Sequence, residues 1–204
     1  MSDIQTALDA LNKKGFNPVF AADAKEALDL VLSLIGESDI VGAGGSATLY
    51  ETGIIDALVN KGHTVYQSDL AQKNGQDRDW AKRNGMTADV YLTSTNALTL
   101  EGDLVNIDCG GNRIAAMLYG PQKVIVVAGC NKLTKNPHTA VARIKMKACP
   151  PNARRLNFDT PCAQTGICSD CDSPDRLCNV TARIQWPPRG REYHVILIDG
   201  DYGF

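Results

Sequence analysis

The 204-residue sequence has no apolar run long enough to cross a bilayer, and its acidic, amphipathic N-terminus lacks the apolar centre of a signal peptide. It also has no Lys/Arg-rich run interleaved with aromatic residues, and its net charge is −2. We therefore predict a cytoplasmic protein that binds neither membranes nor nucleic acid. The three histidines stand in no metal-ligand spacing, so structural or solvated roles are favoured for them.

Strands and helices alternate along the chain. The stretches predicted as strands are 17–20, 39–41, 65–67, 90–93, 124–128 and 194–198. Because this alternation is typical of a parallel sheet covered on both faces, we predict an α/β fold with a mostly parallel sheet and helices on both faces. Glu101-Gly102-Asp103 predicts a hairpin turn. Residues 1–204 are expected to form a single domain that includes a cysteine-rich loop at 158–180.

A glycine-rich segment follows the second predicted strand and leads into a helix. Glycines let backbone N–H groups approach an anion, and hydroxyl groups add donors. The candidate ligand-binding residues here are Gly42, Gly44, Gly45, Ser46 and Thr48. The spacing also matches a dinucleotide-binding fingerprint, but the next strand ends in Gln67-Ser68 and not in an acidic residue, so binding of nicotinamide dinucleotides is disfavoured. A tight turn without any ligand is the alternative.

A second group of polar residues follows the strand at 90–93 and the hairpin. Strand ends meet at one edge of a parallel sheet, so this group is expected to face the glycine-rich segment. The candidate ligand-binding residues are Ser94, Asn96, Asn106, Gly111, Asn112 and Arg113. Asp108 is the candidate base, Arg113 could hold a phosphate or carboxylate with two donors, and Lys132 is a candidate catalytic or phosphate-binding residue. Turn caps, surface ion pairs and an exposed lysine are the alternatives.

Four of the seven cysteines lie in one short loop with the pattern C-x5-C-x2-C-x6-C: Cys162, Cys168, Cys171 and Cys178. Four thiolates in one loop predict a metal site, with a [4Fe–4S] cluster preferred over zinc and four free thiols as the remaining alternative. The odd number of cysteines argues against a complete disulfide framework. The other three are expected to be small buried residues, with Cys109 as a reactive thiol to watch. We expect the loop to lie beside the domain, outside the glycine-lined site.

Three segments resemble the lactate-utilisation (LUD) domain family. They are STNALTLEGDLVNIDCGGNRIAAMLYGPQKVIVVAG, VGAGGSATLYETG and the cysteine loop. The resemblance implies a NagB/RpiA/CoA-transferase-like fold and a setting in lactate oxidation beside iron–sulfur subunits. Members commonly read Asp-Gly-Thr-Gly-Asn-Arg, whereas here Asp108 is followed by Cys109 and Gly110. This departure indicates either a changed specificity or a position that tolerates change.

Three functions remain open from the sequence, and whether the protein is an enzyme is not decided by it. The first is an accessory redox or metabolite-binding protein of organic-acid metabolism that binds a small anionic or phosphorylated metabolite and acts with other redox subunits. The second is a sugar-phosphate or CoA-ester enzyme with a structural metal, for which Glu51 and Glu101 are weaker candidate nucleophiles. The third is a non-catalytic assembly subunit, and a homodimer is plausible for each.

Overall fold

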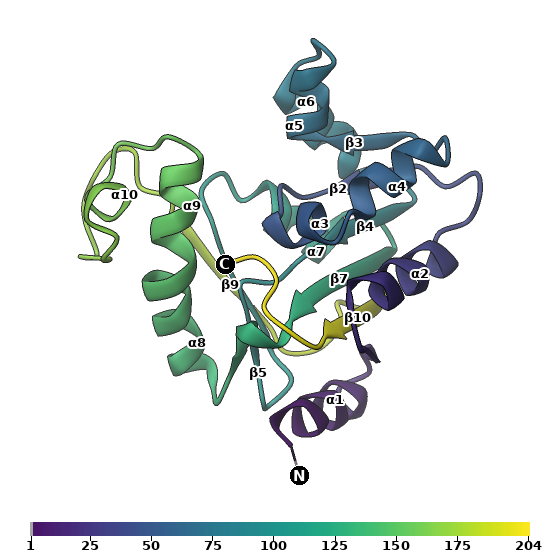
Figure 1. The fold of residues 1–204 in the computed structure, drawn as a ribbon, viewed down its shortest axis with the longest axis horizontal. Helices are drawn as coiled ribbons and strands as arrows, with labels where there is room; N and C mark the ends of the chain where they lie inside the picture. The colour runs from purple at the N-terminus through teal and green to yellow at the C-terminus, as the bar shows by residue number, and fades with distance from the viewer. Residues whose placement is uncertain (1) are drawn as a thin grey trace.

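The computed structural model describes residues 2–204 and is built around a six-stranded parallel sheet (Figure 1). In spatial order its strands are β1 (Asn17–Ala21), β10 (Glu192–Ile198), β7 (Lys123–Gly129), β4 (Val90–Thr93), β2 (Val41–Ala43) and β3 (Val65–Gln67). Every neighbouring pair in this sheet is parallel. The predicted α/β fold with a mostly parallel sheet is therefore confirmed.

Helices cover both faces of this sheet, because its central strands are apolar on both sides. Residues Val124–Ala128 of β7 are fully buried, as expected for a strand between two layers. One face packs against α2 (Ala24–Leu34), α3 (Ala47–Glu51) and α4 (Ile54–Asn60). The other packs against α1 (Asp3–Lys13) and α7 (Asn112–Tyr119). Helices α5 (Ser68–Lys73) and α6 (Arg78–Gly85) follow β3.

A second, four-stranded sheet lies on the α1 and α7 side. Its spatial order is β8 (Leu133–Thr134), β5 (Ala97–Thr99), β6 (Leu104–Asp108) and β9 (Val180–Ile184). Strands β5 and β6 form the predicted hairpin, with Gly102 at a φ of +78° in its turn. Strand β9 was not predicted, because most of its residues are polar or exposed and it pairs along one edge only.

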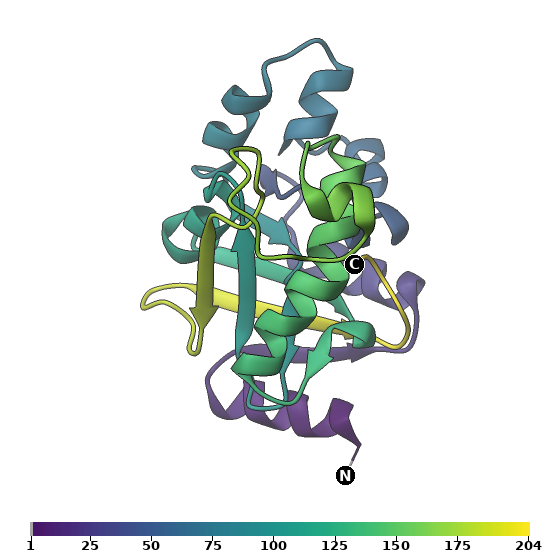
Figure 2. The same ribbon diagram turned by 90° about the vertical axis from the view of Figure 1, so that its left-hand side faces the viewer.

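One long helical rod crosses the second sheet and leads to the cysteine loop (Figure 2). It consists of α8 (Pro137–Arg143), a π-helical turn (Ile144–Ala148) and α9 (Cys149–Arg155). Asn136 and Thr139 begin it with a capping box. The π turn ends one residue before Pro150 and Pro151, which lack the N–H groups that a regular helix needs. A short helix, α10 (Pro161–Thr165), then packs against α9.

Candidate functional site

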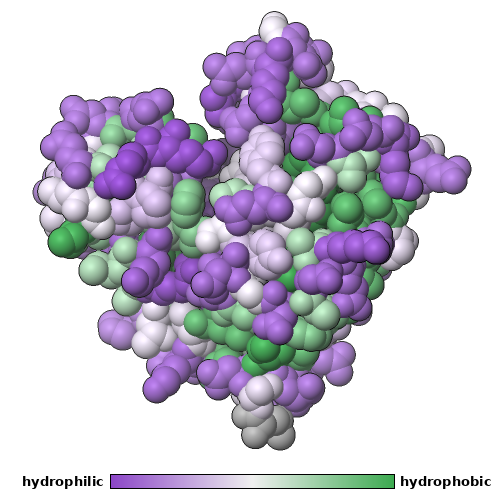
Figure 3. Space-filling model, viewed as in Figure 1, coloured by the Kyte–Doolittle hydropathy of each residue, from purple (hydrophilic) through white to green (hydrophobic). Residues whose placement is uncertain are grey.

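A cavity of about 510 Å³ opens at the carboxyl ends of the parallel strands. Residues that follow β2, β4 and β7 line its floor, and the end of β6 and helices α6 and α9 line its sides. The surface is hollowed here between the lobe of α9 and α10 and the lobe of α5 and α6, and hydrophilic residues border the hollow (Figure 3). The strand ends therefore meet at one site, as the sequence predicted.

Lys132 lies on the floor of the cavity and is only 3% exposed. Its Nζ donates to Thr48 Oγ1 at 2.7 Å and to Ser94 Oγ at 2.8 Å. Within residues 2–204, no carboxylate lies at salt-bridge distance from this amine. Burial, helped by the positive charges of Arg143 and Arg113, lowers the pKa of Lys132 to about 7. Glu51 acts on the amine only from beyond salt-bridge distance, so the ammonium is well suited to receive an anion.

The segment 202–204 closes one side of the Lys132 site. The backbone carbonyl of Tyr202 accepts from Thr48 Oγ1 at 3.1 Å, and that of Gly203 accepts from Asn131 Nδ2 at 3.1 Å. A Cβ atom at Gly203 would lie 2.5 Å from Thr48 Oγ1 and 3.3 Å from the Lys132 amine. Only glycine fits at this position, and the close approach of the backbone at Gly203 helps to keep water away from Lys132.

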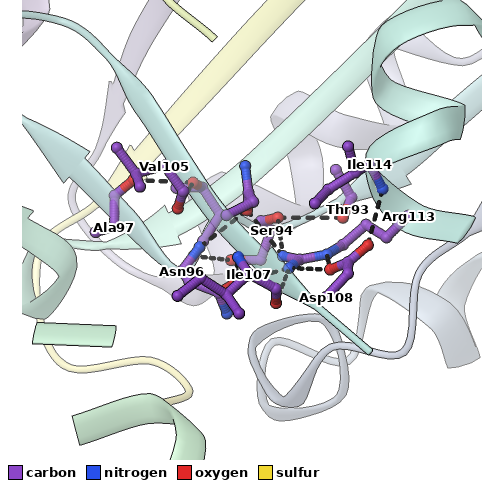
Figure 4. A network of polar contacts seen from close by, with 11 residues as sticks. Thr93, Ser94, Asn96, Ala97, Val105, Ile107, Asp108, Arg113 and Ile114 are labelled. Carbon is purple, nitrogen blue, oxygen red and sulfur yellow. Dashed lines mark hydrogen bonds and ion pairs between the residues drawn. The ribbon is translucent and has the colours of Figure 1, made fainter. Parts of the chain in front are cut away.

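Arg113 is held in a network of polar contacts (Figure 4), and it shares the neighbour Ser94 with Lys132. Its Nε and Nη2 both donate to Asp108 Oδ1, at 2.8 and 2.5 Å. Its terminal nitrogens also donate to Asn106 Oδ1 at 2.9 Å and to Asn96 Oδ1 at 2.7 Å. The other oxygen of Asp108 accepts from the backbone N–H of Ile114 at 2.9 Å. Asp108 thus orients Arg113 and the start of α7.

These contacts change the roles that the sequence suggested for the two residues. All donor groups of Arg113 have protein acceptors, including the carbonyls of Ser94 and Ile107. Arg113 therefore adds fixed positive charge to the cavity wall, but it has no free pair of donors with which to hold a ligand. Asp108 accepts three hydrogen bonds, which suits a positioning role better than proton abstraction.

The cysteine loop does not lie apart from this cavity. One small pocket is lined by five cysteines: Cys149, Cys162, Cys168, Cys171 and Cys178. Cys149 and Leu177 line both this pocket and the large cavity, so the two share a wall. None of the four loop cysteines lines the large cavity, in line with the expected position of the loop, but the loop borders the cavity through Phe158 and Leu177 because α10 packs onto α9. In the described part of the chain, no three His, Cys, Asp or Glu side chains converge on a single metal-ion position.

Comparison with known proteins places the chain in a family. The model of the LUD domain family matches residues 4–198. The chain belongs to the LUD domain family. A crystal structure of a DUF162 family protein from Deinococcus radiodurans is similar to this LUD domain, with a TM-score of 0.55 and 13% identity over 98% of this chain and 99% of that one. At this identity the likeness shows the fold alone.

Ribose 5-phosphate isomerase A from Methanocaldococcus jannaschii gives a TM-score of 0.37 and 17% identity, over 76% of this chain and 64% of that one. A comparison with curated proteins found no match. None of the helices that the structure describes in this LUD domain has the length and apolar character required to span a bilayer.

Most of the predicted site residues of the LUD domain line the cavity. They are Gly45, Ser46, Thr48, Ser94, Asn96, Asp108, Asn112, Arg113 and Lys132. Gly42, Gly44, Asn106 and Gly111 are not part of its lining. Gly42 serves packing instead, because a Cβ at this position would lie 2.2 Å from the carbonyl oxygen of Gly85 in α6. Gly111 begins α7 with a φ of +74°.

Helices α6 and α9 contribute lining residues that were not predicted from the sequence. Arg78 and Lys82 come from α6, and Asn152 and Arg155 come from α9. With these residues included, five cationic side chains and two carboxylates line the cavity. Helical spacing was the available signal in α9, but nothing in the sequence indicated which helix face the cavity would use.

Two of the three isolated cysteines differ from expectation. Cys149 is buried as predicted, Cys130 is partly exposed and Cys109 is exposed. Cys109 lines the large cavity and lies 3.9 Å from the carbonyl oxygen of Arg176 in the cysteine loop.

Proposed function

We propose that this LUD domain protein binds a small anionic metabolite, a carboxylate or a phosphate ester, in the cavity above Lys132. The observation that carries the proposal is the buried amine of Lys132, which has two hydroxyl acceptors and, within residues 2–204, no carboxylate at salt-bridge distance. A buried ammonium is costly unless an anion or a polar ligand compensates it. A bound anion would supply that compensation.

The charge and size of the cavity support the same proposal. Five cationic side chains face two carboxylates, and one of those carboxylates, Asp69, is paired with Arg78 at 2.7 Å. A cavity of about 510 Å³ falls in the range that accommodates small-molecule ligands. Lys132 would donate to the anion at the floor, and Lys82 and Arg155 would contact the outer part of the ligand. The family resemblance favours an organic acid such as lactate or pyruvate.

Isothermal titration calorimetry tests this proposal with L-lactate, pyruvate, inorganic phosphate, ribose 5-phosphate and coenzyme A as separate ligands. We expect at least one of them to bind the wild type and to lose at least about tenfold in affinity with Lys132→Met, because a charge-assisted hydrogen bond is removed. Lys25→Met, an exposed change on α2, is the matched control and should bind as the wild type does. Equal affinities of the Lys132→Met variant and the wild type for every ligand would contradict the proposal.

A second candidate function is proton transfer or imine chemistry by Lys132 itself. A lysine with a pKa of about 7 is partly neutral at neutral pH, and a neutral amine can accept a proton or attack a carbonyl carbon. This favours Lys132 over Asp108 as the base of an enzyme that acts on sugar phosphates or keto acids. Borohydride treatment in the presence of pyruvate or ribose 5-phosphate would trap an imine, and mass spectrometry would then locate the added mass on Lys132. Absence of the adduct would argue against the imine route.

A further inference from the structure

The Lys132 amine is in direct contact with a serine hydroxyl to which anion binding gives no chemical role. Its Nζ lies 2.8 Å from Ser94 Oγ, and both buried side chains line the large cavity. Ser94 follows directly after β4, which lies between β7 and β2 in the parallel sheet. A hydroxyl within hydrogen-bond distance of a buried lysine amine is the arrangement of a serine nucleophile with a lysine base.

A second hydroxyl fixes the direction of the amine. Thr48 Oγ1 lies 2.7 Å from Lys132 Nζ and donates its own proton to the backbone carbonyl of Tyr202 at 3.1 Å. Thr48 therefore accepts from the amine, and a neutral amine keeps its lone pair for the hydroxyl of Ser94. The other contacts of Ser94 Oγ, to Thr48 Oγ1 and to the carbonyl of Thr95, are both longer at 3.4 Å. Lys132 is thus the nearest acceptor for the Ser94 proton.

The charges around the amine favour its neutral form above about pH 7. Burial, together with Arg143 and Arg113, lowers the pKa of Lys132 to about 7. Glu51 raises this pKa only slightly, from beyond salt-bridge distance. Arg113 also donates to the backbone carbonyl of Ser94 at 3.3 Å (Figure 4). Its fixed positive charge therefore stands beside the hydroxyl, where it stabilises negative charge that develops during a reaction.

We propose that Ser94 is the nucleophile of an acyl-transfer reaction, with Lys132 as its general base, on an ester or thioester of a small carboxylic acid. Ser94 Oγ forms a bond to the carbonyl carbon while its proton passes to Lys132 Nζ. The C–O or C–S bond to the leaving group then breaks, and Lys132 returns the proton to the leaving oxygen or sulfur. Water attacks the acyl-serine by the same route, which releases the acid and restores Ser94.

This inference uses the lysine of the proposed anion site but requires its other protonation state. Anion binding needs the ammonium, which dominates below about pH 7, whereas the base is the neutral amine, which dominates above it. The reactivity of Ser94 should therefore rise with pH over the range in which anion affinity falls. The two proposals can then fail separately.

An uncharged fluorophosphonate tests the nucleophile without depending on anion recognition. It reacts with an activated serine by forming an O–P bond and releasing hydrogen fluoride, and mass spectrometry locates the adduct. We expect an adduct on Ser94 of the folded wild type and none after denaturation, with a labelling rate that rises to a plateau above about pH 7. Lys132→Met should slow the labelling of Ser94 at least about 100-fold. Ser33→Ala, an exposed change on α2, should leave it unchanged.

Two acyl compounds, p-nitrophenyl acetate as the ester and acetyl coenzyme A as the thioester, identify the leaving group. We expect acetylation of Ser94 or turnover with at least one of them, and loss of both in Ser94→Ala. Neither acetylation nor turnover with either compound would overturn the acyl-transfer reaction.

The fluorophosphonate experiment also decides the roles of the two residues. Absence of a Ser94 adduct in the folded wild type between about pH 6 and pH 9 would overturn the nucleophile. Equal labelling rates of Ser94 in Lys132→Met and the wild type would overturn the base. Because the position of the adduct and its pH profile are measured on the wild type, the test holds even when the variants do not fold.

Discussion

Replacing Lys132 by methionine should change how the stability of the protein depends on pH. Burial lowers the pKa of Lys132 from 10.5 to about 7, with Arg143 and Arg113 adding to the effect. Below pH 7 the amine is protonated in both the folded and the unfolded state, and the folded state carries the full penalty for the buried charge. Between about pH 7 and pH 10 the folded protein holds a neutral amine while the unfolded chain stays protonated, so the stability of the wild type rises with pH.

The size of this effect follows from the pKa difference. Each pKa unit corresponds to about 1.4 kcal/mol, so the penalty is at most about 5 kcal/mol below pH 7. About 2 kcal/mol of it disappears between about pH 7 and pH 9. Methionine keeps the length of the side chain and does not titrate, so the variant escapes the penalty for the buried charge. It also loses the hydrogen bonds of the amine to Thr48 and Ser94. Each lost hydrogen bond lowers the stability of the variant by about 1 kcal/mol, which offsets part of this gain. The variant should therefore be more stable than the wild type by about 2 kcal/mol near pH 7.

Urea denaturation followed by circular dichroism, at about pH 7 and about pH 9 in buffers without multivalent anions, measures both quantities. The difference in unfolding free energy between Lys132→Met and the wild type should shrink or reverse as the pH rises. Titration of all other groups cancels in this difference, and Lys25→Met should show no such trend. Parallel pH dependences of Lys132→Met and the wild type would refute the reasoning, because they would mean that Lys132 keeps an ordinary pKa.

The remaining predictions concern binding and packing. Anion affinity should fall by up to about tenfold per pH unit above pH 7, since binding requires protonated Lys132, and calorimetry should detect proton uptake. Gly42→Ala should lower the free energy of unfolding in chemical denaturation by about 2 to 4 kcal/mol, because its Cβ would meet the Gly85 carbonyl at 2.2 Å. Gly75→Ala meets no neighbour and should lower it by only about 1 kcal/mol, the strain of an alanine at a φ of +71°. Asp108→Asn should lower the free energy of unfolding by about 2 to 4 kcal/mol, because the guanidinium of Arg113 loses its ion-pair partner. Thermal unfolding measures this loss, and an unchanged unfolding temperature would contradict the prediction.

The sequence predicts the main sheet because each local signal agrees with the tertiary structure. The apolar run at 124–128 is buried on both faces in β7, and Asp23 caps α2 by accepting from the Glu26 backbone. Asn136 begins the helical rod as expected. Strand β9 is different, because three of its five residues are exposed and it pairs with β6, which lies more than 70 residues earlier in the chain. Sequence periodicity does not encode such an edge pairing.

The environment of each site residue was harder to predict than its presence. Sequence placed Lys132 and Arg113 at the correct edge of the sheet, but their roles depend on partners from distant segments. Arg113 loses its free donors to Asp108, Asn96 and Asn106. Lys132 gains its burial partly from the segment at 202–204, which follows the last strand. Burial and partner choice are tertiary properties, and they decide whether a charged side chain binds a ligand or stabilises the fold.

The helical rod connects the large cavity with the cysteine pocket, because residues of the rod line both. Ile144, Ala148, Asn152 and Arg155 recur at helical spacing and line the large cavity along one face of the rod. Cys149 stands at the border of this face, where the π turn changes the helical register just before Pro150. A regular helix through 144–155 would shift every later residue around the axis. The π turn thus helps to set which residues of α9 face the cavity and where Cys149 meets the loop.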